Sequence, residues 1–131
     1  MTSENDAGGK TTILVVDDVE ELLSVIELIL TDAGYSVLMA NCGREAVRIF
    51  ETKKDEIALT LLDVELPDIN GIEVFKKIKL ISRDAKVIFA SSYYRDEIID
   101  MLINASGLSF LHKPFGNIEL FSQIKNALSI G

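Results

Sequence analysis

Three aspartates and a lysine are the residues of this chain whose types and spacing could do chemistry together. Asp17 and Asp18 directly follow the apolar run at residues 12–16. Asp63 follows a second apolar run, and Lys113 lies near the end of the chain. Carboxylates that are packed together repel one another and need a cation, and their hard oxygen atoms suit Mg²⁺ or Mn²⁺ better than zinc. A carboxylate can also attack phosphorus to form an aspartyl phosphate, so the set suits metal-assisted phosphoryl transfer.

Each of these residues, taken alone, also has an ordinary structural interpretation. Asp17 and Asp18 could cap the helix that follows them, and Asp63 could cap the helix after its own strand. Lys113 could be a surface lysine, and Ser91 could be a solvated residue at a strand end. The chemical interpretation therefore depends on whether the fold brings the residues together.

The pattern of apolar residues predicts an alternation of strands and helices. Short β-branched or apolar runs predict strands over 12–16, 35–40, 57–62, 86–90 and 108–111. Helical spacing of apolar residues predicts helices over 19–33, 43–53, 72–81, around 98–103 and over 118–128. Such an alternation is typical of an α/β fold, a doubly wound parallel sheet with helices on both faces and right-handed crossovers.

The carboxyl ends of parallel strands lie along one edge of the sheet, where open α/β folds place their ligands. The predicted strands one, three, four and five end at Asp17-Asp18, Asp63, Ser91-Ser92 and Lys113. Three carboxylates, a hydroxyl and an ammonium should therefore meet at this edge. The segment after Asp63 contains Pro67 and the pair Asn70-Gly71, which predict a turn because Pro fixes φ and Asn-Gly tolerates positive φ.

Composition limits the other classes of function. The 131 residues suit one domain, with a polar lead-in at 1–11 and the domain itself at 12–131. No apolar run is long enough for a transmembrane helix or a signal peptide. The single cysteine, Cys42, excludes an internal disulfide and fits the cytoplasm, and the single His112 cannot form a zinc site. A net charge of −8 argues against direct binding to nucleic acid or to an anionic membrane.

The chain resembles the receiver domain of two-component response regulators, the CheY-like family, from about residue 12 to residue 128. The motifs that carry this resemblance are Asp17-Asp18 after an apolar strand, the loop Asp63…Pro67…Gly71, Ser91-Ser92 at a strand end, and Lys113-Pro114-Phe115. Each motif is weak alone, but their order and spacing together are specific. The resemblance implies a flavodoxin-like (βα)5 fold with strand order 2-1-3-4-5.

The resemblance also implies a role for the residues at the edge of the sheet. Asp63 would be the phosphoacceptor, with Lys113 pairing with a phosphoryl oxygen. Mg²⁺, or Mn²⁺ in its place, would be held by Asp17, Asp18, Asp63 and the backbone carbonyl of Glu65.

Further residues would transmit or time the signal in such a domain. Ser91 would hydrogen-bond the phosphoryl group, and Phe110 would change rotamer as that hydroxyl moves. The Lys113-Pro114 peptide bond is expected to be cis. Glu65 and Tyr93 flank the site and would tune the lifetime of the phosphorylated state, with shielding of the phosphoryl group by Tyr93 expected to dominate.

The function expected from this resemblance is that of a signalling module in a phosphorelay. A phosphohistidine on a sensor kinase or phosphotransfer protein would donate the phosphoryl group to Asp63. The fourth helix, fifth strand and fifth helix would then change conformation and bind a downstream protein or a fused output domain. Phosphorylation could also lead to a dimer. The module would catalyse only its own phosphorylation and dephosphorylation.

Two other classes of function remain open at this point. A pseudo-receiver would keep the fold only for protein contacts, but the complete acid pair, acceptor and lysine argue against it. A Mg²⁺-dependent phosphatase could also use an aspartyl phosphate, and Glu65 has the spacing of its second acid. The chain has no room for the cap domain that such phosphatases carry.

Overall fold

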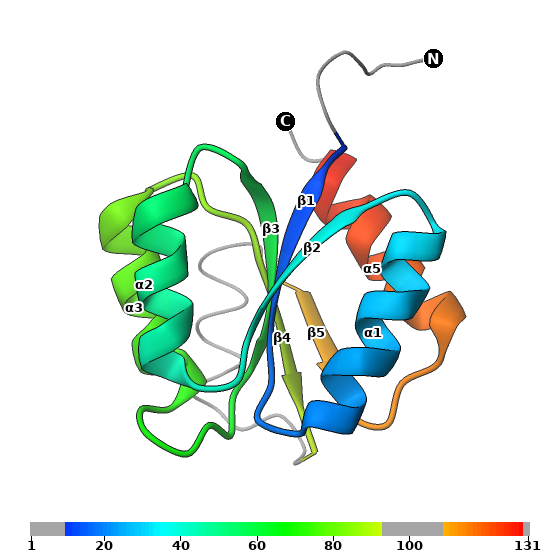
Figure 1. Cartoon of the computed structure of the whole chain (residues 1–131), viewed down its shortest axis with the longest axis horizontal. Coiled ribbons are helices and arrows are strands. Elements are labelled where there is room, and N and C mark those ends of the chain that lie inside the picture. The colour runs from blue at the N-terminus through cyan, green and yellow to red at the C-terminus, as the bar shows by residue number, and fades with distance from the viewer. Residues whose placement is uncertain (1–9, 93–108, 130–131) are drawn as a thin grey trace.

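A five-stranded parallel sheet forms the centre of the computed structural model, which describes residues 10–92 and 109–129 (Figure 1). The strands are β1 (Thr12–Val16), β2 (Ser36–Ala40), β3 (Ile57–Asp63), β4 (Val87–Ser91) and β5 (Ser109–His112). Their order is β2-β1-β3-β4-β5, and all neighbouring strands are parallel. The predicted doubly wound α/β sheet and its strand order are confirmed.

Helices cover both faces of this sheet. Figure 1 shows α1 (Glu20–Asp32) and α5 (Asn117–Ser129) on one side, and α2 (Gly43–Lys53) and α3 (Gly71–Ile81) on the other. The helix expected around 98–103 and residues 1–9 of the expected lead-in lie outside the described residues. Among the helices that the structure describes, none combines the length and the apolar character needed to cross a membrane.

The core is divided between the two faces by the alternation of side chains along each strand. In β1, Ile13 and Val15 pack in the cluster beneath α1 and α5, whereas Leu14 and Val16 pack in the cluster beneath α2 and α3. A side chain of this kind contributes roughly 1.5–3 kcal/mol when it is fully buried. The strands are therefore buried on both faces, and polar residues are left to the strand ends.

The predicted limits of β2, β3, β4 and β5 each shift by one residue at one end or both, and local hydrogen bonding accounts for two of these shifts. The second strand begins at Ser36, since the N–H of Tyr35 donates to Leu30 and closes the end of α1 around Gly34, whose φ is 100°. Strand β4 continues to Ser91, whose carbonyl accepts the N–H of Lys113 at 2.7 Å. Ser91 is therefore the last residue of β4, and its backbone is bonded to Lys113, the first residue after β5.

The turn after β3 forms as predicted, but the reason predicted for Asn70-Gly71 is wrong. Among the glycines that the structure describes, only Gly34 has a positive φ. Asn70 is instead the N-cap of α3, and its Oδ1 accepts the N–H of Glu73 at 3.0 Å. The same bond shows that Asp63 does not cap this helix.

Gly71 is required by a close approach of the helix to the strand that carries Asp63. A Cβ at this position would overlap the carbonyl oxygen of Asp63 and lie 2.8 Å from the Cα of Val64. The N–H of Gly71 also donates to the carbonyl of Val64 at 2.8 Å. The start of α3 thus packs directly on the backbone that presents Asp63.

Asp68 ties the same loop to a second helix. Its two carboxylate oxygens accept the N–H groups of Arg44 and Gly43 at 2.9 and 2.8 Å, at the first turn of α2. These N–H groups have no partner within their own helix, so an anion stabilises them. The bond from Arg44 is the main reason that the pKa of Asp68 lies well below its usual range. The loop after Asp63 is therefore held at Asp68 and at Gly71.

We predict that Gly71→Ala destabilises the protein and disturbs the backbone of Asp63. Overpacking of this kind costs roughly 1–3 kcal/mol in the free energy of unfolding, which urea denaturation measures. Gly116→Ala is the matched control, since a Cβ there meets only Glu119 Oε1 at 3.9 Å. Equal losses of stability in the two variants would contradict this account of Gly71.

Candidate functional site

Lys113 joins the ends of two strands by contacting two carboxylates. Its Nζ lies 2.6 Å from Asp17 Oδ2 and 3.1 Å from Asp63 Oδ2. Asp17 and Asp63 are each 3% exposed, and the Lys113 side chain is 14% exposed. Water screens such pairs little, so the ammonium and the two carboxylates interact strongly. The Lys113-Pro114 peptide bond that follows is cis.

Asp18 completes a cluster of three carboxylates. Asp17, Asp18 and Asp63 each offer an oxygen, and these three atoms lie within 4.8 Å of one another. Asp18 is exposed, so the cluster is open to solvent on one side. Helix α1 has Val19 as its N-cap and no side-chain capping bond, so neither aspartate caps it. The predicted convergence at the sheet edge is observed.

Backbone N–H groups hold the two buried carboxylates in place. Asp17 Oδ1 accepts the N–H of Val19 at 2.9 Å, and Asp63 Oδ1 accepts the N–H of Glu65 at 3.0 Å. Each carboxylate therefore uses one oxygen on its own loop and the other on Lys113. This leaves the carboxylates little freedom to turn away from one another.

Burial and mutual repulsion make the site electrostatically costly. Burial is the main cause that raises the pKa of Asp63 to about 6, and the charge of Asp17 adds to it, while Lys113 partly offsets both. Burial alone would lower the pKa of Lys113, but its hydrogen bonds to Asp17 and Asp63 raise the pKa above the usual value. With all groups ionised, three carboxylates and one ammonium leave a formal charge of −2. A divalent cation would neutralise it.

Ser91 and Glu65 form a second set of contacts beside this cluster. The Ser91 side chain is buried, and its hydroxyl donates to Glu65 Oε2. Glu65 Oε1 accepts the N–H of Ser92 at 3.2 Å. Sequence reasoning placed Ser91 and Glu65 near the site but did not predict a bond between them. Asp63 pairs with Ala90, so Glu65, two residues later, comes level with Ser92, and only this register, which the sequence does not give, indicates the contact.

Phe110 and Tyr93 are the two other residues of the predicted site. Phe110 lies in β5, half-buried, and packs with Phe89 in the cluster beneath α2 and α3. Tyr93 lies outside the described residues. Asp68, which anchors the loop to α2, was not predicted, because its partners lie 24 and 25 residues away in sequence.

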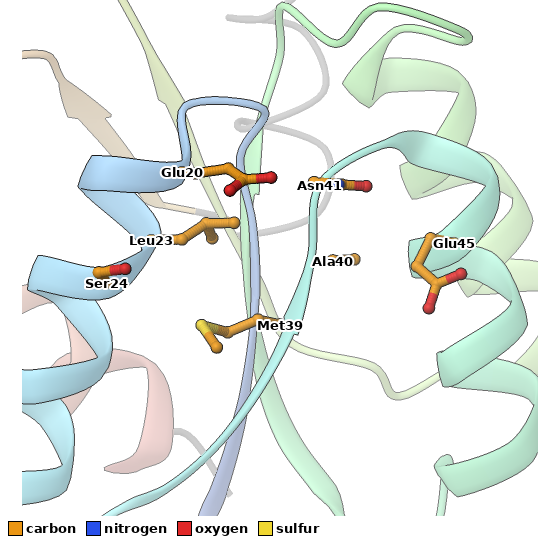
Figure 2. Close-up of a pocket in the computed structure, with 7 residues that line it drawn as sticks. All are labelled: Glu20, Leu23, Ser24, Met39, Ala40, Asn41 and Glu45. Atoms are coloured by element: carbon orange, nitrogen blue, oxygen red, sulfur yellow. The ribbon is translucent and has the colours of Figure 1, made fainter.

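A separate pocket of about 480 Å³ lies between α1, the end of β2 and the start of α2 (Figure 2). It is lined by Glu20, Leu23, Ser24, Met39, Ala40, Asn41 and Glu45. Figure 2 shows Glu20 and Glu45 on opposite walls, and none of the predicted site residues is part of the lining. The chemistry that the residues permit therefore lies in the acid cluster and not in this pocket.

Comparisons with known proteins find a family model and curated relatives that match most of this chain. The family model of the response regulator receiver domain matches residues 13–125. The chemotaxis protein CheY of Thermotoga maritima is 35% identical over 79% of this chain and 85% of its own length. The transcriptional regulatory protein PhoP of Bacillus subtilis, which regulates alkaline phosphatase synthesis, is 34% identical over 88% of this chain and 48% of its own length. The chain thus spans most of the one relative and about half of the other.

A solved structure shows the same fold in a related chain. The response regulator TrrA of Thermotoga maritima, crystallised in complex with Mg²⁺-BeF, is 31% identical and superposes with a TM-score of 0.79. The match covers 90% of this chain and 99% of that chain. With the strand order, the cluster of three aspartates and the match over residues 13–125, the comparisons show that this chain belongs to the response regulator receiver domain family of two-component signalling.

Proposed function

We propose that Asp63 is the phosphoacceptor of this receiver domain. The observation that carries the proposal is its position: a buried carboxylate at the end of the central strand, 3.1 Å from Lys113 and beside Asp17 and Asp18. Its phosphoryl donor would be a phosphohistidine on a sensor kinase or on a phosphotransfer protein. A carboxylate oxygen of Asp63 attacks phosphorus, the P–N bond breaks, and its electron pair returns to the imidazole.

Catalysis of this transfer consists of positioning and of stabilising charge on the phosphoryl oxygens. Lys113 is close enough to pair with one of these oxygens, because it already contacts Asp63. The Ser91 hydroxyl and the N–H of Ser92 lie at the end of the neighbouring strand and can donate to the others. The N–H of Glu65 holds Asp63 in the orientation for attack.

The acid cluster fits Mg²⁺ as the cofactor of this reaction. It offers only oxygen ligands, its three ligand atoms lie within 4.8 Å, and its open side leaves room for water. Asp17, Asp18 and Asp63 would hold the ion together with the backbone carbonyl of Glu65, and Mn²⁺ suits the same ligands. Bound there, the ion supplies positive charge to the transferring phosphoryl group.

The surface beside Lys113 is suited to a protein donor. A hollow of about 420 Å³ is lined by Leu22, Ser92, Lys113, Pro114 and Phe115. Its walls are largely apolar, and Lys113 connects it with the acid cluster. A partner that docks there would bring its phosphohistidine to the open side of the site.

The output of the domain would be a change in the face that includes β5 and α5. Ser91 ends β4 directly beside β5, with which it is paired at His112, and Phe110 lies two residues earlier in β5. A phosphoryl group that draws the Ser91 hydroxyl toward it would shift this packing and so favour binding of a downstream protein, a fused output domain or a second copy.

Tyr93 would shield the phosphoryl group from water.

The alternative as a phosphatase is not favoured by the position of Glu65. Both oxygens of its carboxylate are engaged by Ser91 and Ser92, so it is not placed as a general acid toward a leaving group. The pseudo-receiver alternative predicts no phosphorylation, so the labelling experiment described next distinguishes it from a phosphoacceptor.

We predict that the protein incorporates phosphate from a radiolabelled acyl phosphate in Mg²⁺ and that Asp63→Asn abolishes this labelling. The amide is a poor nucleophile, whereas the fold does not depend on the charge. Chelation of Mg²⁺ should also prevent labelling of the parent. Asp84→Asn, an exposed change of equal charge, is the control and should label normally. Stoichiometric labelling of Asp63→Asn would refute the assignment.

We predict that Asp63→Asn stabilises the metal-free protein more at pH 8 than at pH 4.5. The pKa of Asp63 is about 6 when folded, above the ordinary value of 3.8, so folding favours the protonated form. The stability that protonation provides is therefore fully present below pH 3.8 and is lost as the pH rises from there through 6. A neutral side chain should restore on the order of 1–2 kcal/mol at pH 8. Thermal denaturation in a chelator measures the difference, and equal shifts at both pH values would contradict it.

A further inference from the structure

Glu65 spans the gap between two strand ends and uses its whole carboxylate on one side of the site. Its N–H binds Asp63, two residues earlier, so its backbone is fixed at the end of β3. Its side chain then crosses to the end of β4, where Oε2 accepts the Ser91 hydroxyl and Oε1 accepts the Ser92 N–H. The contact joins residues 26 and 27 positions apart.

The two donors that bind Glu65 form a small anion site. One is a buried hydroxyl and the other is a backbone N–H, and both point toward the same carboxylate. Charge-assisted hydrogen bonds of this kind are roughly twice as strong as neutral ones. A tetrahedral oxyanion on Asp63 would need the same donors, because Asp63 ends the strand adjacent to theirs. Two anions cannot share these donors, since each O–H or N–H can be directed at only one acceptor and the like charges repel one another.

We propose that the carboxylate of Glu65 is an internal occupant of the phosphoryl-oxygen site and must leave Ser91 and Ser92 before a phosphoryl group on Asp63 can bind there. This inference rests on the proposed function of Asp63. Glu65 then acts as a competitor built into the chain. It lowers the affinity of the site for a phosphoryl group and holds Ser91 in place until that group displaces it.

The competition differs from a general effect of negative charge near the site. Asp17 and Asp18 also carry charge, but they lie in the metal cluster, where the oxygens of Asp17 accept the Val19 N–H and the Lys113 ammonium. Glu65 competes because its side chain is long enough to reach both donors. Shortening that side chain while keeping its charge therefore separates occupancy from repulsion.

The test uses beryllofluoride in saturating Mg²⁺ as the probe for the phosphoryl group, with its Kd measured by titration. Glu65→Ala removes the occupant and should lower the Kd about tenfold, which corresponds to about 1.4 kcal/mol. Glu65→Asp keeps the charge but is one methylene shorter, and it should lower the Kd at least about threefold, or roughly 0.65 kcal/mol. Glu56→Ala is the control for net charge, because Glu56 is exposed and precedes the opposite end of β3. Its Kd should match that of the parent.

Hydrogen exchange at the Ser92 amide provides a readout that does not depend on affinity. The amide should be protected in the parent, exposed in Glu65→Ala, and protected again in Glu65→Ala when beryllofluoride and Mg²⁺ are added. Protection in unliganded Glu65→Ala equal to the parent's would overturn the inference.

The outcomes separate this inference from the proposed function. If the parent binds beryllofluoride and the Kd is unchanged in Glu65→Ala, Asp63 remains the phosphoacceptor and the role of Glu65 is refuted. If Glu65→Asp behaves as the parent while Glu65→Ala binds tightly, repulsion and not occupancy is the cause, and the inference also fails. If the parent binds no beryllofluoride at all, the proposed function fails and the inference fails with it.

Discussion

The burial of Asp17 and Asp63 against Lys113 is the interaction on which the rest of the site depends. Two carboxylates that are each 3% exposed would repel one another strongly without the ammonium between them. Even with it, burial keeps the pKa of Asp63 near 6. The arrangement is therefore electrostatically unsatisfied, with a formal charge of −2 once Asp18 is included. A site in this condition favours the arrival of a cation.

The fold supplies the rigidity that this unfavourable cluster requires. The strand that carries Asp63 is central in the sheet and buried on both faces. Its following loop is bound to α2 through Asp68 and to α3 through the close approach at Gly71. Movement is thus restricted in the loop that holds the acceptor, whereas Glu65 can rotate away without breaking either tie. The adaptable part of the site is therefore the Glu65 side chain.

The architecture and the cluster could be predicted from the sequence because both follow from repeating patterns. The alternation of Ile13 and Leu14 between two core clusters is visible as an apolar run, the acids follow such runs, and Lys113 comes two residues after one. The contacts that position the site could not be predicted in this way. Asp68 caps a helix 24 residues earlier, and the purpose of Gly71 became clear only from the backbone that packs against it. The bond between Glu65 and Ser91 depends on the register of two strands and the rotamer of one side chain, which no local pattern specifies.

The central claim is that a phosphoryl group becomes covalently attached to Asp63, and chemical trapping tests it most directly. Borohydride reduces an aspartyl phosphate to homoserine, so the protein can be phosphorylated in Mg²⁺, reduced, digested and sequenced by mass spectrometry. We expect homoserine at position 63 and unmodified aspartate at positions 17 and 18. Homoserine at Asp17 or Asp18, or its absence from all three positions in protein that has incorporated phosphate, would contradict it.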